Sequence, residues 1–393
     1  MKEAKASRRK FLNASINAAA GAAVMSALPE KIAGANERLE VEPRGGNRTK
    51  VIRADTPRIR ISAIGLNHGH IYGQVGAVLR GGGELVSFFA KEPELVAAFS
   101  KRFPQAKLAR SADEILEDKS IQLIVSASIP DERAPLGIQA MRHGKDFMAD
   151  KPGITSLEQL AEVRRVQQQT RRIYSIMYSE RFENPATVRA GELIKAGAIG
   201  SVIQTIGLGP HRENPKSRPA WFFDRERYGG IICDIGSHQV DQFLFFTGST
   251  EAEVVASQIG NLHHPQHPKF EDFGDMTVRG DRGTGYIRVD WFTPDGLSTW
   301  GDGRLTILGT DGYIEVRKNI DIAGRAGANH LFLADQKGVH YFDCSKEPLP
   351  YGEQLVFDIV NRAETAMSQT HCFRATELAL KAQKQAQRIS LKK

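Results

Sequence analysis

Residues 58–70, RIRISAIGLNHGH, decide the fold class of this 393-residue chain. The first residues alternate and then become apolar before Gly65, a pattern typical of a buried strand in a parallel sheet. Asn67, His68 and His70 follow directly, and a helical pattern runs on from them. A strand, a glycine turn and a helix open the α/β unit in which ligands bind at the carboxyl ends of the strands.

The same alternation continues downstream. The sequence predicts further strands at residues 84–89, 121–126 and 146–149, and helices at 93–103 and 135–143. Strands that alternate with helices indicate βαβ units and a parallel sheet. We therefore predict an α/β Rossmann domain over residues 57–175.

The turn after the first strand is where a dinucleotide would lie, with its pyrophosphate on the backbone amides of the helix start. Gly65 fits the first glycine of the G-x-G-x-x-G motif, but Asn67 and His70 occupy the second and third positions. Asn67 tolerates a positive φ better than most residues, which softens this departure. A doubly wound domain without a nucleotide remains the alternative.

The end of the second predicted strand bears on the choice of nucleotide. An acidic residue there usually bonds the ribose hydroxyls of NAD, whereas this chain has Ala90 followed by Lys91. A cation at this place suits a 2′-phosphate, although Glu92 lies close by. The pattern favours NADP slightly over NAD.

Residues 176–393 show a different order of predicted helices and strands. The sequence predicts helices at 188–195, 354–368 and 375–388, and strands at 201–207, 253–258, 276–279, 286–291, 304–307 and 313–316. Turn signals join several of these strands, which indicates a mostly antiparallel sheet in an α+β domain. One face of such a sheet often forms an oligomer interface, so we expect a homo-oligomer.

Two polar groups stand out as candidates for acid–base chemistry. Lys151 directly follows the strand at 146–149, and Pro152 fixes its backbone, so the lysine would face the crevice. Asp234 and His238 would share one face of a helix at i and i+4. Histidine titrates near neutrality and can accept a hydroxyl proton. Taken alone, Lys151 could equally be a solvated surface lysine, and Asp234 and His238 could equally be a buried structural pair.

A third group combines aromatic and charged residues. His211 and Arg218 precede Trp221, and aromatic faces beside charges suit sugar rings; a packed loop is the alternative. His263, His264 and His267 are interrupted by prolines and lack the carboxylate spacing of a metal site, so we expect no metal there.

The first 35 residues indicate an export signal. Arg8-Arg9 precede Phe11-Leu12, and a weakly apolar run follows, which favours a twin-arginine signal over a Sec signal or a basic arm. Residues 36–56 resemble a linker. We thus expect a periplasmic or secreted protein that uses the twin-arginine export machinery.

Composition excludes several classes of protein. The chain is 25% charged and 41% hydrophobic, which is ordinary for a globular protein. Most of the net charge of +7 lies in the N-terminal segment, so it does not indicate nucleic acid. No later apolar run approaches ~20 residues, which excludes a polytopic membrane protein. The three cysteines form no CxxC motif and imply no disulfide framework.

From Arg58 to Ser390 the chain resembles the Gfo/Idh/MocA oxidoreductase family. The resemblance rests on Asp150-Lys151-Pro152 in place of the family's Glu-Lys-Pro, on Gly229-Gly230, and on the pair Asp234 and His238. It implies a nicotinamide-binding domain, hydride transfer at a sugar or polyol carbon, and catalytic roles for Lys151, Asp234 and His238. The loop at 126–130 matches the family's loop of cofactor contacts. Together with the first turn and the end of the second strand, it gives as candidate cofactor contacts Gly65, Asn67, His68, His70, Lys91, Ser126, Ile129, Pro130 and Lys151. The candidate substrate contacts are His211, Arg218, Trp221, Asp234 and His238.

The sequence therefore predicts an exported oxidoreductase that retains its nicotinamide cofactor and acts on a small carbohydrate or polyol. The first alternative is an NAD-dependent glycosidase or lyase that oxidises its substrate only transiently. The second is a carbohydrate-binding protein without catalysis.

Overall fold

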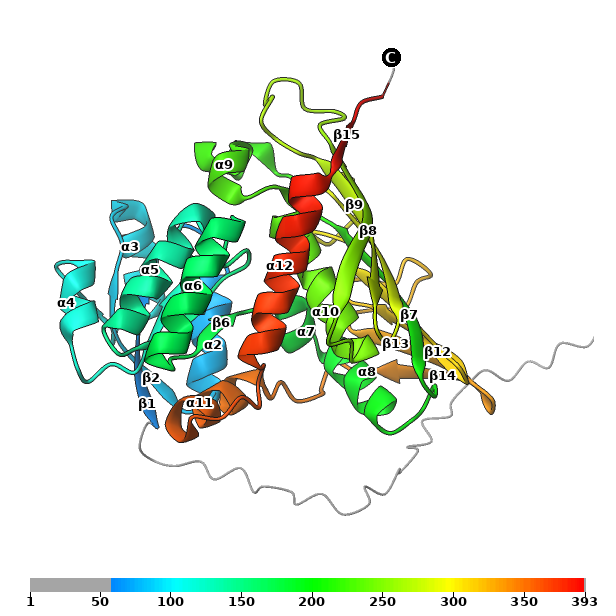
Figure 1. Ribbon diagram of the computed structural model, residues 1–393, viewed down its shortest axis with the longest axis horizontal. Helices are drawn as coiled ribbons and strands as arrows, with labels where there is room; N and C mark the ends of the chain where they lie inside the picture. Colours follow the sequence, from blue (N-terminus) through cyan, green and yellow to red (C-terminus); the bar gives the residue numbers. More distant parts are fainter. Residues whose placement is uncertain (1–57, 392–393) are drawn as a thin grey trace, which may run out of the picture. The chain divides into compact units, whose positions relative to one another are not determined.

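The computed structural model describes residues 58–391, which belong to one compact unit. The predicted signal at 1–35 and the predicted linker at 36–56 lie outside the described residues. Both predicted domain types are present in the described part (Figure 1).

The first sheet has six parallel strands in the order β3-β2-β1-β4-β5-β6. Strands β4 and β5 are buried along their whole length, as expected for strands covered on both faces. The elements in chain order are β1 (Ile59–Ile64), α2 (Ile71–Arg80), β2 (Gly83–Phe89), α3 (Pro93–Arg102), β3 (Lys107–Leu108), α4 (Ala112–Glu117), β4 (Leu123–Ser126), α5 (Pro130–Arg142), β5 (Asp146–Ala149), α6 (Leu157–Thr170) and β6 (Tyr174–Ile176).

This strand order creates a topological switch point at β1. Strand β1 pairs with β2 on one side and with β4 on the other, so the order reverses at β1. Ligands of open α/β sheets bind at such a switch point, outside the carboxyl ends of the strands. The predicted Rossmann domain is confirmed, and the boundary predicted at 175/176 falls inside β6.

Several predicted helices begin earlier in the structure. The helices predicted at 188–195, 354–368 and 375–388 begin at residues 185, 351 and 369 instead. The helix predicted from Pro135 is a further case. We expected a helix from Pro135, but α5 begins at Pro130 and contains Pro135 within it. Proline is favoured in the first turn of a helix because the first amides have no partner there, so Pro130 is the better start.

The second sheet has nine strands in the order β14-β13-β12-β11-β7-β10-β9-β8-β15. It is mostly antiparallel, with parallel pairs at β7–β10 and β8–β15. The remaining elements are α7 (Ser179–Phe182), α8 (Pro185–Lys195), β7 (Val202–Pro210), η1 (Pro215–Ser217), η2 (Ala220–Phe223), α9 (Arg225–Tyr228), η3 (Ile232–Gly236), α10 (Ser237–Thr247), β8 (Ala252–Gly260), β9 (Phe273–Gly280), β10 (Thr284–Asp290), β11 (Arg304–Gly309), β12 (Gly312–Arg317), β13 (His330–Asp335), β14 (Gly338–Asp343), α11 (Tyr351–Asn361), α12 (Gln369–Gln385) and β15 (Gln387–Ile389).

The predicted α+β domain is confirmed, but three strands were missed. Strands β13 and β14 form an edge hairpin, and β15 is a three-residue strand that overlaps the end of the stretch predicted as the last helix. Such short or half-exposed segments carry little hydrophobic periodicity, which is the main sequence signal for a strand.

Helix α10 packs closely on the second sheet because β7 contains two glycines. A Cβ on Gly207 would lie 2.7 Å from the side-chain oxygen of Gln239, and a Cβ on Gly209 would lie 2.9 Å from Ile235. These positions therefore need glycine to let the helix carrying His238 approach the sheet.

The end of the chain returns to the first sheet. Figure 1 shows α12 (red) between α6 and the strands β8 and β9, and α11 (orange) beside α2. The Tyr351 hydroxyl of α11 is 2.9 Å from the Ser175 hydroxyl, and the Tyr174 amide of β6 donates to Gln369 at 2.9 Å. The last two helices thus join the two sheets.

We expect Gly352→Ala to lower the free energy of unfolding by about 1–3 kcal/mol. A Cβ on Gly352 of α11 would lie 1.8 Å from the carbonyl oxygen of Ala77 in α2, so the two helices would have to separate. Chemical denaturation measures the effect. The control is Gly73→Ala in α2, where an added Cβ would meet no atom within 4 Å. This variant should raise the free energy of unfolding by about 0.5–1 kcal/mol. Equal behaviour of the two variants would contradict the prediction.

Among residues 58–391, none of the helices combines the length and apolar character needed to cross a membrane. The three cysteines, Cys233, Cys344 and Cys372, are buried and unpaired.

Candidate active site

A cavity of about 580 Å³ lies beside the switch point of the first sheet. It is lined on one side by the turn after β1 and on the other by segments of the second domain. All five predicted substrate contacts line it, as do five of the nine predicted cofactor contacts: Asn67, His68, His70, Pro130 and Lys151.

The other four predicted cofactor contacts lie near the cavity lining without belonging to it. Gly65 has a φ of +79°, and a Cβ there would lie 2.5 Å from that of Ser128, so only glycine fits. Ser126 ends β4, Ile129 precedes α5, and Lys91 is exposed after β2. Glycine at this position therefore lets the turn after β1 pack directly against the loop after β4.

Lys151 and Asp234 form the central ion pair of the cavity. The Lys151 ammonium lies 2.8 Å from Asp234 Oδ1, and the two side chains are 4% and 14% exposed. Burial opposes ionisation of Asp234, but the Lys151 ammonium outweighs it and lowers the pKa of the carboxyl. A lysine in this setting can donate a hydrogen bond to a substrate oxygen while its charge stays balanced.

His238 also lines the cavity, one turn beyond Asp234. Burial lowers the pKa of its imidazole to about 4, so the ring is neutral at neutral pH. Its Nδ1 has no hydrogen-bond partner among residues 58–391. A neutral, unpartnered imidazole facing a cavity can accept a proton from a bound hydroxyl group.

The helix between these residues differs from the predicted one. Residues Ile232–Gly236 form a π-helical turn, and α10 begins only at Ser237. The Ile231 amide donates to Glu271 at 3.0 Å and the Ile232 amide to Gln383 at 2.9 Å. These contacts with distant parts of the chain widen the turn, and π-turns of this kind are frequent at functional sites.

Gly229 and Gly230 make this turn possible. Both have φ values near +90°, and a Cβ on Gly230 would lie 2.3 Å from the Gln383 side chain. The paired glycines that the sequence singled out therefore serve the backbone rather than a ligand contact.

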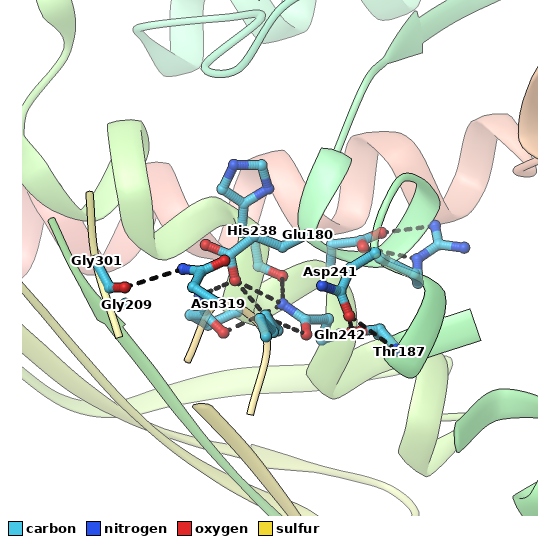
Figure 2. Close-up of polar contacts among 12 residues, drawn as sticks. Glu180, Thr187, Gly209, His238, Asp241, Gln242, Gly301 and Asn319 are labelled. Atoms are coloured by element: carbon cyan, nitrogen blue, oxygen red, sulfur yellow. Dashed lines mark hydrogen bonds and ion pairs between the residues drawn. The ribbon is translucent and has the colours of Figure 1, made fainter. Parts of the chain in front are cut away.

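A buried polar group beneath His238, which we call the Glu180 cluster, was not predicted from the sequence. Glu180 accepts hydrogen bonds from Lys318 and from Gln239, the latter at 2.7 Å, and Gln242 accepts from Lys318 at 2.8 Å. Figure 2 shows the imidazole of His238 pointing away from this cluster, while its backbone carbonyl accepts from Gln242 at 2.9 Å. The cluster thus fixes the backbone that carries His238.

Glu180 and Lys318 also line the cavity. Burial opposes ionisation of Glu180, but the Lys318 ammonium outweighs it and lowers the pKa of the carboxyl. The two residues are 138 positions apart, so no local sequence pattern could have paired them.

The wall opposite the first sheet is aromatic. All three tryptophans of the chain, Trp221, Trp291 and Trp300, line the cavity. The His211 ring lies edge-on to Trp300 with ring centroids 4.5 Å apart, and burial lowers its pKa to about 3. The Arg218 guanidinium lies 4.3 Å from the Phe222 ring centroid. Such a wall can bind the apolar face of a sugar ring.

Two family models match the chain. The model described as "Oxidoreductase family, NAD-binding Rossmann fold" matches residues 59–178. The model described as "GFO/IDH/MocA C-terminal domain" matches residues 187–315. The matches cover both domains and the residues of the Lys151–Asp234 pair.

Curated relatives and a solved structure agree with these models. The chain is 27% identical to a 1,5-anhydro-D-fructose reductase of Ensifer adhaerens and 26% identical to a levoglucosan dehydrogenase of Pseudarthrobacter phenanthrenivorans, over 46% and 50% of this chain. The matched stretches cover 54% and 51% of those relatives, so the chain spans about half of their length. A solved structure from Erwinia carotovora atroseptica is 48% identical, with a TM-score of 0.82, over 84% of this chain and 99% of that one.

Proposed function

Because the chain belongs to the Gfo/Idh/MocA oxidoreductase family, we propose that it transfers a hydride between a nicotinamide dinucleotide and a hydroxyl-bearing carbon of a sugar or polyol. The observation that carries this proposal is the meeting of Lys151, Asp234 and His238 in one cavity at the switch point of a parallel sheet.

The residues around the first turn fit a dinucleotide. Gly65 leaves no room for a side chain, and Asn67, His68 and Pro130 line the cavity beside it. When bound, a nicotinamide dinucleotide supplies the group that accepts or returns a hydride.

Lys151 of the first domain and Asp234 and His238 of the second domain act on the substrate hydroxyl. Lys151 donates a hydrogen bond to the hydroxyl oxygen and stabilises the negative charge that develops as its proton leaves. His238 accepts that proton, because burial keeps its imidazole neutral. Asp234 holds the Lys151 ammonium in place at 2.8 Å.

The aromatic wall supports a carbohydrate as the substrate. Trp221, Trp291 and Trp300 line the cavity, while Asp234 and Arg218 offer polar groups that can bind hydroxyls. The names of the two curated relatives also refer to sugar substrates.

The choice between NAD and NADP depends on two neighbouring residues. Lys91 is exposed after β2 and can pair with a 2′-phosphate, whereas the Glu92 carboxylate accepts a hydrogen bond from Asn67 at 2.7 Å and would repel one. Because Ala90 leaves the usual acidic position empty, NADP stays our slight preference.

Release of bound nucleotide tests the proposed function directly. The purified protein would be heat-denatured, and the supernatant analysed by mass spectrometry. We expect stoichiometric NADP or NAD, and its reduction when sugars are added to the native protein. Failure to bind either nucleotide in a titration would contradict the proposal. Hydrolysis of a glycoside with no net change in NADH or NADPH would support the glycosidase or lyase alternative.

We also propose export by the twin-arginine route. The support is Arg8-Arg9 followed by Phe11-Leu12 at the start of the sequence. Free nicotinamide nucleotides are scarce outside the cytoplasm, so an exported enzyme would have to carry its own. Replacing both arginines with lysine should keep the protein in the cytoplasm, which cell fractionation measures.

We propose that the protein forms a homo-oligomer through the face of the second sheet that is turned away from α10. Gly207 faces α10, so its neighbour Ile206 points to the opposite face, where it lies across from Tyr286. On the next strands Leu308 lies across from Tyr313, and these two side chains are 42% and 46% exposed. Thr306 and Gln204 lie between the two pairs on the same face. Exposed apolar side chains on a sheet face of this kind typically mark an interface.

Leu308→Glu is expected to convert the oligomer into smaller species, because it places a charge in the apolar face. Analytical ultracentrifugation measures the mass. Leu108→Glu is the matched control, since Leu108 is 47% exposed but lies on the first sheet. An unchanged mass of the Leu308→Glu protein would exclude this interface.

A further inference from the structure

Three side chains at the first turn converge in an unusual way. His68 Nδ1 lies 2.9 Å from Asp150 Oδ2, and His70 Nδ1 lies 2.9 Å from Asp150 Oδ1. The two imidazole rings stand nearly perpendicular, with centroids 4.1 Å apart. The ligand atoms of all three residues lie within 4.8 Å of one another.

The two histidine contacts with Asp150 differ in their geometry. The His70 contact has hydrogen-bond geometry, but the His68 contact does not, and both His68 Nδ1 and Asp150 Oδ2 are buried without a hydrogen-bond partner. The Asp150 side chain is only 2% exposed, so bulk water does not hydrate its carboxylate. The cluster thus brings two imidazoles and a buried carboxylate together with their ligand atoms close enough to bind one ion.

From this geometry we propose that His68, His70 and Asp150 bind a divalent transition-metal ion. Two imidazole nitrogens and one carboxylate are a common ligand set for Zn²⁺ and Fe²⁺, whereas Mg²⁺ and Ca²⁺ prefer oxygen ligands alone. The set leaves further coordination positions open. His68 and His70 line the cavity, so an oxygen atom of a bound molecule can occupy an open position.

Contacts with neighbouring residues fix the orientation of the Asp150 carboxylate. Its Oδ1 accepts the Lys151 backbone amide at 2.8 Å, and Arg133 Nη2 lies 3.2 Å from Oδ2. Hydrogen bonds and charges around a ligating carboxylate orient it toward the metal. Asp150 follows β5 and the histidines follow β1, so the parallel sheet brings them to one edge.

The site also explains the departure from the glycine motif. His70 replaces the third glycine, and His68 lies between it and Asn67. The substitution that weakens the dinucleotide signature thus completes the H-x-H pair. The metal site does not depend on the proposed hydride transfer.

Calorimetric titration of the chelator-treated, full-length protein with Zn²⁺ tests the site. We expect one strong site per chain and no comparable binding of Mg²⁺. His70→Ala should weaken Zn²⁺ binding by about 100-fold or more, since a ligand is lost. His70 is suited to replacement because its side chain is 43% exposed. In the Co²⁺-loaded protein, His68→Gln should change the visible absorption spectrum.

His143→Ala is the matched control, since His143 is an exposed histidine at the end of α5. It should leave Zn²⁺ binding unchanged. No stoichiometric Zn²⁺ binding, or equal binding by the wild type and His70→Ala, would overturn the proposal. The titration uses neither nucleotide nor sugar, so its outcome is separate from that of the proposed function.

Discussion

Replacing His238 with alanine is expected to lower kcat/KM for sugar oxidation by about 100-fold or more, while the nucleotide remains bound. The imidazole lines the cavity, and within the described part of the chain its Nδ1 has no hydrogen-bond partner. The backbone at this position is held by Gln242 and the Glu180 cluster rather than by the imidazole. The variant should therefore fold normally and lose only the proton acceptor.

Steady-state kinetics with both nucleotides measures the loss, and mass analysis of released nucleotide measures binding. His143→Ala serves again as an exposed control and should be fully active. Unchanged turnover of His238→Ala would remove its acid–base role. Loss of nucleotide together with activity would indicate a structural role instead.

The pH dependence gives an independent check on the same residue. Burial lowers the pKa of His238 to about 4, and the neutral imidazole is the form that accepts a proton. The kcat/KM of oxidation should thus stay constant from neutral pH down to about pH 5 and decline as the pH passes through the pKa. A loss of activity near pH 6.5, the ordinary histidine value, would contradict this assignment.

Lys151→Met is expected to lower both stability and activity. It leaves Asp234 in a buried site without its cation, and breaking a buried ion pair from one side costs about 3–5 kcal/mol. It also removes the donor to the substrate oxygen, so kcat/KM should fall by about 100-fold or more. Denaturant titration and steady-state kinetics measure the two effects.

A double variant separates these effects. In Lys151→Met/Asp234→Asn the carboxylate is neutral, so most of the lost stability should return while activity remains low. Recovery of activity by the double variant would show that Lys151 acts only by keeping Asp234 charged and folded. A stable single variant would show that the pair is more solvated than its exposure indicates.

The sequence predicted the position of Lys151 better than it predicted the backbone that carries Asp234 and His238. Lys151 was found because the short apolar strand at 146–149 ends beside it, and strand ends of a parallel sheet define the crevice. Asp234 and His238 were found as a pair, but on an ordinary helix. The π-turn between them depends on Glu271 and Gln383, which are distant in sequence, so a local periodicity could not show it.

Pairings over long sequence distances account for the rest of what was missed. Glu180 comes from a single-turn helix and Lys318 follows β12, and neither segment carries a motif. Asp150 was identified only as part of the Asp-Lys-Pro motif. Its approach to His68 and His70 follows from the order of strands in the sheet, which the sequence pattern did not give.

The return of α11 and α12 to the first sheet has a consequence for synthesis of the protein on the ribosome. The Rossmann strands leave the ribosome first, but α2 and β6 gain their covering contacts with Gly352 and Gln369 only when residues 351–385 have been made. Domains generally fold as they emerge, and those that lack part of their cover expose apolar surface. The first domain therefore stays incompletely covered until residues 351–385 have been translated.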